Sequence, residues 1–417
     1  MYGRILTGEK GLKFMDEPGS YDCPMPETFR DKAGMLVFLA WLFYLGFVAR
    51  TLFAPLMPEI EAELGISHSD AGKLFLMMSS GYLLAPLCSG LISSRIEHLG
   101  TLKLSAWLIG LSLLPFSFIT SKEGIGLLLM IVGFAGSLHL PSAIATITAE
   151  IQRSDWGKGL SVHQLAPPLS FVSAPLIAAT LLQWFNWRTI LLIWAGIALV
   201  TALIYTLKGK GGAFPGKALN FKNAGEVAGN PSFWLMVLLF AMAVGGNAGI
   251  FAMLPLFFVT ERGFDLTSAN VLIGLSQVSG IVFVFLAGWL TDRVGQKTVM
   301  AGTLFITAVL TILLAIVKGT MLIVVLFLQP AVLSAFFPAG FAAISRTAPP
   351  ALRSVTNSLG PPLSFLLGGG VMPVVIGYMA ESYSFSSGIL FAGCFMMIGP
   401  VCVFFLTLGE NDELEGC

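Results

Sequence analysis

A few polar and ionisable side chains interrupt long apolar stretches of this sequence, and these are the places where chemistry could occur. Arg50, His139 and His163 each lie inside such a stretch. An arginine presents five N–H donors in a fixed fork, which suits a carboxylate, phosphonate or similar oxyanion. Histidine changes its charge near neutral pH and can carry a proton. These residue types predict anion binding at Arg50, both proton coupling and a substrate contact at His139, and a further substrate contact at His163.

Neutral amides complete the set of candidate substrate-binding residues, because they offer hydrogen bonds without the cost of burying a charge. They are Gln164, Asn247, Gln277, Gln329 and Asn357. Structural roles remain open for all of these side chains. An amide can join packed helices, a histidine can bond to a neighbour, and an arginine can extend to the membrane interface.

Other chemical motifs are absent from the sequence. It contains no Gly-x-x-x-x-Gly-Lys-Ser/Thr phosphate loop, no His-Glu-x-x-His, no Cys-x-x-Cys and no Gly-x-Ser-x-Gly. The five cysteines have neither metal-ligand nor redox spacing; they are Cys23, Cys88, Cys394, Cys402 and Cys417. We therefore expect a protein that is not an enzyme and that binds no cofactor and no metal.

The composition identifies the environment in which these side chains must be held. Of 417 residues, 56% are hydrophobic and 11% are charged, against about 45–50% and about 25% in soluble domains. Such a chain cannot bury its apolar side chains in a water-soluble core. The 23 basic residues equal the 23 acidic ones, so no nucleic-acid partner is expected. The sequence predicts an all-α integral membrane protein with the lipid bilayer as its partner.

Twelve apolar runs are long enough to cross a bilayer, which takes about 20 residues each. They form two groups of six, in the regions 34–207 and 232–408, joined by a polar linker over 208–231. The predicted spans are 34–58, 71–94, 101–120, 124–149, 159–183, 188–207, 232–259, 268–291, 298–317, 320–345, 354–379 and 384–408. Residues 1–33 and 409–417 are predicted to be terminal tails.

The distribution of positive charge predicts the orientation of these spans. When the N-terminus is placed inside, most of the 23 Lys and Arg residues fall in inner segments, as the positive-inside rule requires. This bias predicts a multi-pass protein of the cytoplasmic membrane with both termini in the cytoplasm. We expect it to be a monomer.

The two groups of spans carry an internal repeat. The segment Glu63–Ala71 recurs 198 residues later, at positions 261–269, and Gly90 and Arg95 match Gly288 and Arg293 at the same offset. The segments Leu165–Phe171 and Leu359–Phe365 match at an offset of 194. Parallel repeats of this kind place a site between the halves, near the middle of the membrane.

The segment from Gly288 to Lys297, Gly-Trp-Leu-Thr-Asp-Arg-Val-Gly-Gln-Lys, resembles the signature of the major facilitator superfamily. The family carries a second copy between spans 2 and 3, where this chain has Ser94 in place of the aspartate. The resemblance implies twelve helices in two pseudo-symmetric bundles and a gate that closes the inner side. The candidate gating residues are Gly90, Arg95, Glu150, Gly288, Asp292, Arg293 and Arg346. Gly288 is expected to allow close helix approach, Asp292 to pair with Arg293, and Glu150 to pair with Arg95.

Prolines and glycines mark candidate hinges in spans 5 and 11. Pro167 and Pro168 occupy positions equivalent to Pro361 and Pro362, and Gly369 follows the second pair. Proline removes a backbone donor and kinks a helix, which neighbouring helices can accommodate inside a bundle. Equivalent kinks in equivalent spans predict paired gating hinges, with static shaping of the path as the alternative.

Two narrower resemblances favour different substrates. Span 1, with Arg50 preceded by Tyr44–Ala49, is similar to organic-anion and organic-phosphate porters. Span 5, with Ser161–Leu165 and Ala174–Leu176, is similar to fosmidomycin-resistance-type exporters. We therefore expect a secondary transporter of a small organic anion that works by rocker-switch alternating access. A multidrug or metabolite exporter driven by proton antiport is the alternative. A membrane sensor or lipid-handling protein without solute transport is a third hypothesis.

Overall fold

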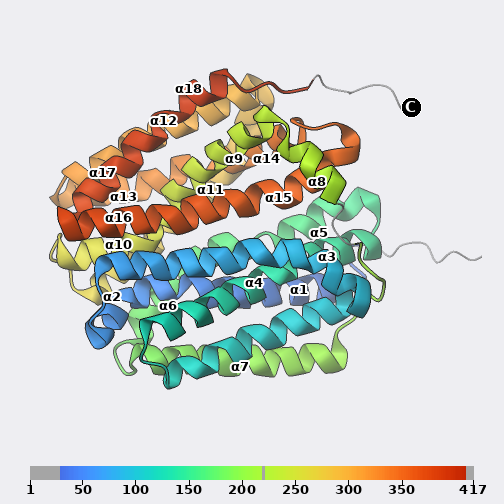
Figure 1. Cartoon of the computed structure of the whole chain (residues 1–417), viewed down its shortest axis with the longest axis horizontal. Coiled ribbons are helices and arrows are strands. Elements are labelled where there is room, and N and C mark those ends of the chain that lie inside the picture. The colour runs from blue at the N-terminus through green and yellow to red at the C-terminus, as the bar shows by residue number, and fades with distance from the viewer. Residues whose placement is uncertain (1–28, 218–220, 410–417) are drawn as a thin grey trace, which may run out of the picture.

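The computed structural model describes residues 29–217 and 221–409, and within these ranges the chain is helical and contains no strand. Residues 1–28 and 410–417 of the predicted tails lie outside the described residues. The helices run roughly parallel to one another in two groups (Figure 1). We call the end of the bundle that holds the connecting segment 209–230 the linker end, and the opposite end the far end.

The first half contains six spans, some of them built from two consecutive helices. They are α1 (Ala33–Thr51) with α2 (Phe53–Leu64), α3 (His68–Leu113) with a short 3-10 turn (Leu114–Ser117), α4 (Lys122–Glu150), α5 (Trp156–His163) with α6 (Ala166–Leu181), and α7 (Trp187–Lys208). The helix α3 contains two spans, because Glu97 has φ 62° and ψ 170° and breaks the helix between them.

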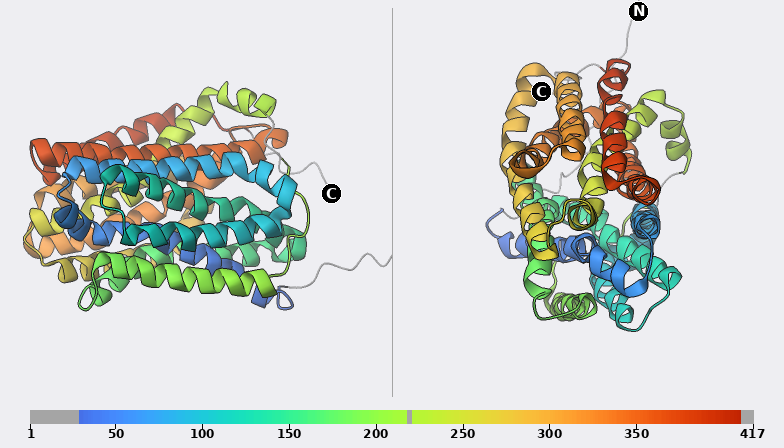
Figure 2. Two further views of the ribbon diagram at one scale, coloured as in Figure 1. Left: turned by 60° about the horizontal axis from the view of Figure 1, so that its bottom comes forward. Right: turned by 90° about the vertical axis from the view of Figure 1, so that its left-hand side faces the viewer.

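The second half repeats this arrangement after the linker helix α8 (Phe221–Ala228). Its spans are α9 (Pro231–Val244) with η3 (Gly245–Gly249) and α10 (Ile250–Thr260), α11 (Leu266–Val294), α12 (Gln296–Ile316), α13 (Gly319–Ser334) with α14 (Phe336–Ser345), α15 (Arg353–Phe365) with η5 (Leu366–Val371) and α16 (Met372–Ser382), and α17 (Phe385–Met396) with α18 (Gly399–Phe404). Both η3 and η5 are π-helical. Figure 2 shows the two halves as neighbouring groups of helices.

The predicted fold class is confirmed. Among the residues that the structure describes, eleven segments are long and apolar enough to span a membrane, and the longest of them, His68–Ser117, contains two spans. Apolar side chains such as Leu111, Phe118 and Leu207 are exposed on the outside of the bundle, where lipid can cover them. All of the predicted spans correspond to helices, with boundaries that differ by a few residues.

Helix caps repeat at equivalent positions in the two halves. Ser67 accepts a hydrogen bond from the backbone N–H of Asp70, and its repeat mate Asp265 accepts one from that of Ser268. Such caps satisfy the first N–H groups of a helix, which have no partner within it. Hydrogen bonds from Ser268 hold the pKa of the Asp265 carboxyl below its usual value. The duplication therefore preserves helix-start chemistry as well as hydrophobic pattern.

Each half also uses an equivalent glutamate to join its first and last spans. Glu63 accepts hydrogen bonds from Trp187 Nε1 at 2.6 Å and Arg188 Nε at 2.8 Å. Its repeat mate Glu261 accepts one from the backbone N–H of Ser386, the residue equivalent to Arg188, at 2.9 Å. These bonds fix the far end of each six-helix group.

Contacts between the halves concentrate toward the far end, where α2 meets α10, α3 meets α16 and α6 meets α11. Asn270 Nδ2 donates to the Pro55 carbonyl across this boundary at 3.2 Å. A Cβ at Gly72 would overlap the Pro373 carbonyl, so α3 and α16 approach each other at backbone distance there. The structure is therefore closed between the halves at the far end.

Candidate functional site

Arg50 lies close to the middle of the first span. The continuous segment Ala33–Leu64 crosses the bundle, and Arg50 is 14 residues from its far end, which is about 21 Å at about 1.5 Å per residue. Its side chain is 4% exposed. Nε and Nη1 have no hydrogen-bond partner among the residues that the structure describes. Snorkelling to a membrane interface does not account for a guanidinium buried at this depth.

Three aromatic rings enclose the Arg50 guanidinium, and we call them the aromatic cage. The guanidinium carbon lies 4.8 Å from the ring centroid of Phe47, 4.4 Å from Tyr82 and 4.8 Å from Phe365. Phe47 and Tyr82 belong to the first half of the chain, whereas Phe365 comes from α15 in the second. Aromatic faces attract a cation, so the cage stabilises the charge while both halves cover it.

The two span histidines form a buried pair. His139 of α4 and His163 of α5 have their Nε2 atoms 3.1 Å apart, and the rings are 2% and 0% exposed. Both rings stack on Phe43 of α1, with centroids 5.3 Å and 4.4 Å away. His163 Nδ1 has no hydrogen-bond partner among the described residues. Sequence spacing gave no indication that these histidines bond to each other.

One face of α1 connects the histidine pair to the arginine. Phe43, Phe47 and Arg50 are spaced i, i+4 and i+7, which places them on the same side of a helix. The Phe43 and Phe47 rings are 4.9 Å apart in an edge-to-face arrangement. The arginine and the histidine pair therefore belong to one continuous buried surface.

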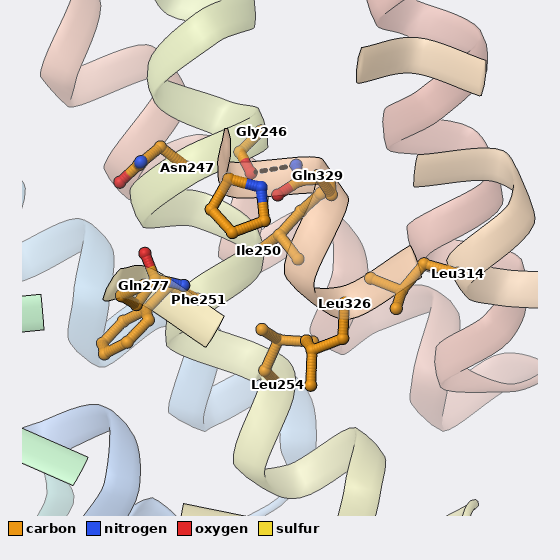
Figure 3. Close-up of a pocket in the computed structure, with 10 residues that line it drawn as sticks. Gly246, Asn247, Ile250, Phe251, Leu254, Gln277, Leu314, Leu326 and Gln329 are labelled. Carbon is orange, nitrogen blue, oxygen red and sulfur yellow. Dashed lines mark hydrogen bonds between the residues drawn. The ribbon is translucent and has the colours of Figure 1, made fainter. Parts of the chain in front are cut away.

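Three of the predicted amides line one small cavity in the second half (Figure 3). They are Asn247 in η3, Gln277 in α11 and Gln329 in α13. Gln329 Nε2 donates to the Gly246 carbonyl at 2.8 Å, a bond drawn in Figure 3. The cavity has room for about one water molecule. In this conformation it is too small for an organic substrate.

The predicted substrate-binding residues do not form a single group. Arg50 does not line the amide cavity. Gln164 is exposed just beyond the end of α5. Asn357 is exposed near the linker end, and its Nδ2 donates to Ser345 Oγ of α14 at 3.0 Å. Arg50 and the two histidines thus lie along α1, and three amides line the cavity in the second half. The other two amides, Gln164 and Asn357, belong to neither group.

The sequence matches the model of the Major Facilitator Superfamily over residues 36–288 and 263–416. The chain belongs to the Major Facilitator Superfamily. Family membership agrees with a multi-pass membrane protein, and several of the similar proteins are transporters by name.

Several named proteins are similar to this chain. The Membrane sensor protein UhpC of Escherichia coli (strain K12) is 24% identical over 61% of this chain and 63% of its own length. The D-galactonate transporter of Escherichia coli O6:H1 is 21% identical over 87% and 92%. The Probable sulfoacetate transporter SauU of Cupriavidus necator is 19% identical over 94% and 98%.

Solved structures of other proteins share the fold. A bacterial homolog of the human lysosomal transporter Spinster superposes with a TM-score of 0.78 at 15% sequence identity. That superposition covers 90% of this chain and 96% of the other.

The superfamily signature lies at the linker end between α11 and α12, without the predicted internal pair. Asp292 and Arg293 are both exposed, and the Arg293 guanidinium carbon lies 4.1 Å from the Trp289 ring centroid. No salt bridge joins Asp292 to any described residue. A Cβ at Gly288 would meet no atom within 4 Å. The expected close helix approach at Gly288 is therefore absent here, because no other segment packs against it.

The predicted pair of Arg95 and Glu150 is also absent. Glu150 Oε2 lies 3.0 Å from Lys32 Nζ, and Glu150 Oε1 accepts a hydrogen bond from the backbone N–H of Gly212. Arg95 is exposed. Glu150, the last residue of α4, therefore holds both the start of α1 and the linker against the end of α4. Gly90 is partly buried in the same helix as Arg95.

The two proline pairs occupy different local structures. In span 5 the helix breaks after His163, and Pro167 and Pro168 lie in the first turn of α6, where their missing N–H groups cost little. In span 11, Pro361 and Pro362 lie inside α15, and the irregular backbone comes later, in η5 with Gly369. The two proline pairs therefore do not form equivalent kinks, and that prediction is wrong.

The cage aromatics and Phe43 are the functional candidates that the sequence interpretation missed. The spacing of Phe43 and Phe47 from Arg50 could have indicated those two rings. The internal repeat could have indicated Phe365, because this residue ends the repeated Leu-Ser-Phe segment. Its repeat mate Phe171 also reaches the other half, where it meets Phe251 with ring centroids 4.8 Å apart.

Proposed function

We propose that this protein is a secondary transporter that moves a small organic anion, such as a carboxylate or phosphonate, across the cytoplasmic membrane. Arg50 binds the anion, and the two halves of the chain rock against each other to give alternating access. The linker end and both termini face the cytoplasm in this proposal, and the working unit is a monomer.

The burial of Arg50 is the observation that carries the proposal. A charge near the middle of a bilayer costs about 2.5–3.5 kcal/mol on insertion scales and persists where it has a function. Two of its N–H-bearing nitrogens have no partner among the described residues, and no acidic side chain in that part of the chain forms a salt bridge with it. A bound anion would supply both the charge and the missing acceptors.

The aromatic cage supports a rocking mechanism. Phe365 belongs to the second half and covers the guanidinium at 4.8 Å, so a rotation of the halves that separates α15 from α1 and α3 would uncover Arg50. In the proposed cycle the cage holds the empty site closed, and the anion replaces the rings as the partner of the charge. The anion contacts Arg50 in the uncovered state and not in the covered state, and this difference in contact couples anion binding to the motion.

Two relatives support an organic anion as the substrate class. The names of the sulfoacetate and D-galactonate transporters specify carboxylate-bearing molecules, and these proteins align with most of the chain. We propose proton coupling through His139 and its partner His163, because histidine can take up and release a proton and this pair packs on Phe43, on the buried surface that also holds Arg50.

Ligand binding and uptake with defined Arg50 variants test this function. The purified protein is screened by thermal shift with sulfoacetate and D-galactonate, with neutral D-galactose as the comparison. For a hit, Arg50→Gln should weaken binding by about 3 kcal/mol, or roughly 150-fold. Arg50→Lys should weaken it less, because it keeps the charge and loses only the fork. Arg153→Gln is the matched control, since Arg153 is exposed at the linker end.

Equal binding by wild type and Arg50→Gln would reject the anion site. Export of neutral or cationic drugs is then the second candidate, favoured by the aromatic rings around Arg50 and by similarity to the Multidrug resistance protein MdtG of Serratia proteamaculans, 25% identical over 71% of this chain. Ligand binding without saturable flux in liposomes would instead favour a sensor, the role named for UhpC.

A further inference from the structure

A second cavity, distinct from the Arg50 region, lies at the linker end of the second half. Its volume is about 470 Å³, within the range of about 300–1,000 Å³ that is typical of small-molecule sites. The start of α9, the end of α14, the start of α15 and the segment after α18 meet around it. None of the residues discussed as substrate contacts lines it.

Two arginines line this cavity, and the described lining residues include no aspartate or glutamate. Arg346 donates from Nε and Nη2 to the Gly409 carbonyl at 3.2 Å and 2.7 Å, and from Nη1 to Gln296 Oε1 at 3.4 Å. A guanidinium carries five N–H donors, so these three bonds leave two donors on Arg346. Arg353 Nε is buried and has no hydrogen-bond partner among the described residues.

Neutral donors accompany the two charges. The hydroxyls of Ser232 and Thr407 lie 2.6 Å apart on the cavity lining, and α15 begins at Arg353 with no side-chain cap on its first turn. Uncapped N–H groups at a helix start favour a negative charge. The cavity thus combines two cations, hydroxyl groups and a helix start, which is the donor set that binds phosphate oxygens.

We propose that this cavity binds a phosphate group. Two sources share this chemistry: the head group of an anionic phospholipid and a water-soluble phosphate. The surroundings favour the lipid, because Phe404 and Phe405, just before the cavity residue Thr407, are 82% and 69% exposed. Large apolar side chains exposed on a membrane protein contact lipid, and basic pockets at helix ends bind lipid head groups.

Native mass spectrometry of the delipidated full-length protein tests the proposal. Phosphatidylglycerol and phosphatidylcholine with identical acyl chains are titrated separately, and inorganic phosphate binding is measured by equilibrium dialysis. We expect preferential retention of phosphatidylglycerol, weakened about tenfold by Arg353→Gln and further by the Arg346→Gln/Arg353→Gln double variant. The control Lys297→Gln removes an exposed charge at the same end and should bind like wild type.

The lipid titration and the inorganic phosphate measurement distinguish a phospholipid head group from a water-soluble phosphate. Arginine-dependent binding of inorganic phosphate without a lipid preference supports a soluble phosphate ligand. The absence of both kinds of binding, or equal binding by the double variant and Lys297→Gln, overturns the proposal. If the double variant does not fold, Arg353→Gln and Arg353→Lys decide the question, and the lysine should retain more binding.

The acidic end of the chain provides an additional comparison. Glu410, Asp412 and Glu413 follow Gly409 in the sequence, and their carboxylates could compete for the same arginines. A chain that ends at Gly409 is therefore titrated in parallel. Binding by the full chain supports the phosphate site. Binding by the shortened chain alone would mean that the carboxylates exclude phosphate, and the proposal would be wrong for the intact protein.

Discussion

The Arg50 guanidinium lies 4.8 Å from the ring centroid of Phe365, and the two residues come from opposite halves of the chain. A buried cation of the first half is thus covered by an aromatic side chain of the second. The contact must break when the halves separate around this point. The contact therefore stabilises the folded chain, and the loss of the contact also contributes to the free energy of the conformational change.

Replacement of Phe365 by alanine should strengthen anion binding. The ring competes with the anion for the same cation, and a buried cation–π contact contributes about 0.5–2 kcal/mol. Its removal should raise the apparent affinity by up to about thirtyfold, measured by thermal shift or by isothermal titration. The control is Phe171→Ala, because this repeat mate also crosses between the halves, against Phe251, and does not cover Arg50. Equal gains in the two variants would show that the effect is general loosening and not release of Arg50.

Loss of either paired histidine should uncouple transport from the proton gradient. In the proposed mechanism His139 and His163 share a proton through the 3.1 Å Nε2–Nε2 contact, so glutamine at either position keeps a polar group and removes the titration. His139→Gln and His163→Gln should abolish accumulation driven by a pH gradient and preserve exchange of labelled for unlabelled substrate. His98→Gln is the control, since His98 contacts Ser142 and Phe214 outside the pair. Gradient-driven uptake that survives in both pair variants would rule out this proton site.

The fold was predictable because membrane solvation leaves a strong signal in sequence. A run such as that of α7, Trp187–Lys208, must satisfy its backbone internally and present apolar side chains to lipid. The repeat of Glu63 at Glu261 then indicated two equivalent halves. These properties depend on residue type and spacing along one helix.

The site was predictable only in part, because its geometry depends on contacts between helices that are distant in sequence. Arg50 stood out as an isolated charge in an apolar run. By contrast, nothing in the sequence specified that His139 would meet His163 or that Phe365 would meet Arg50. Glu150 illustrates the limit: Arg95 was a reasonable partner by topology, but Lys32 and the Gly212 N–H lie closer in the folded chain.

Both termini should be found in the cytoplasm. The positive-inside rule predicts this orientation, and the helices α1 and α15 both begin at the linker end (Figure 1). A C-terminal fusion to alkaline phosphatase, which is active only in the periplasm, should be silent, whereas a fusion to green fluorescent protein should fluoresce. An active phosphatase fusion would reverse the proposed orientation of the whole chain.

Substitutions at the two ends of the bundle should shift the conformational equilibrium in opposite directions. Asn270 donates to the Pro55 carbonyl across the closed far end, so Asn270→Ala removes a bond that only this state makes. A buried hydrogen bond contributes about 1 kcal/mol, which is roughly fivefold in population. The variant should increase the fraction of molecules open at the far end. Asp292 makes no salt bridge with any described residue in this far-end-closed state. We propose that it forms the latch when the linker end closes, so Asp292→Asn should increase the far-end-closed fraction.

Cysteine labelling from the two sides of the membrane measures both shifts in one background. Single reporter cysteines are placed at Leu56 on α2, which is fully buried near the far-end boundary, and at Asn357, which is exposed near the linker end. Asn270→Ala should speed labelling at position 56 and slow it at 357, and Asp292→Asn should do the reverse. The double variant should return toward wild type, because the sites are far apart and their energies add. If both single variants speed labelling at both reporters, they loosen the fold, and neither residue acts as a gate.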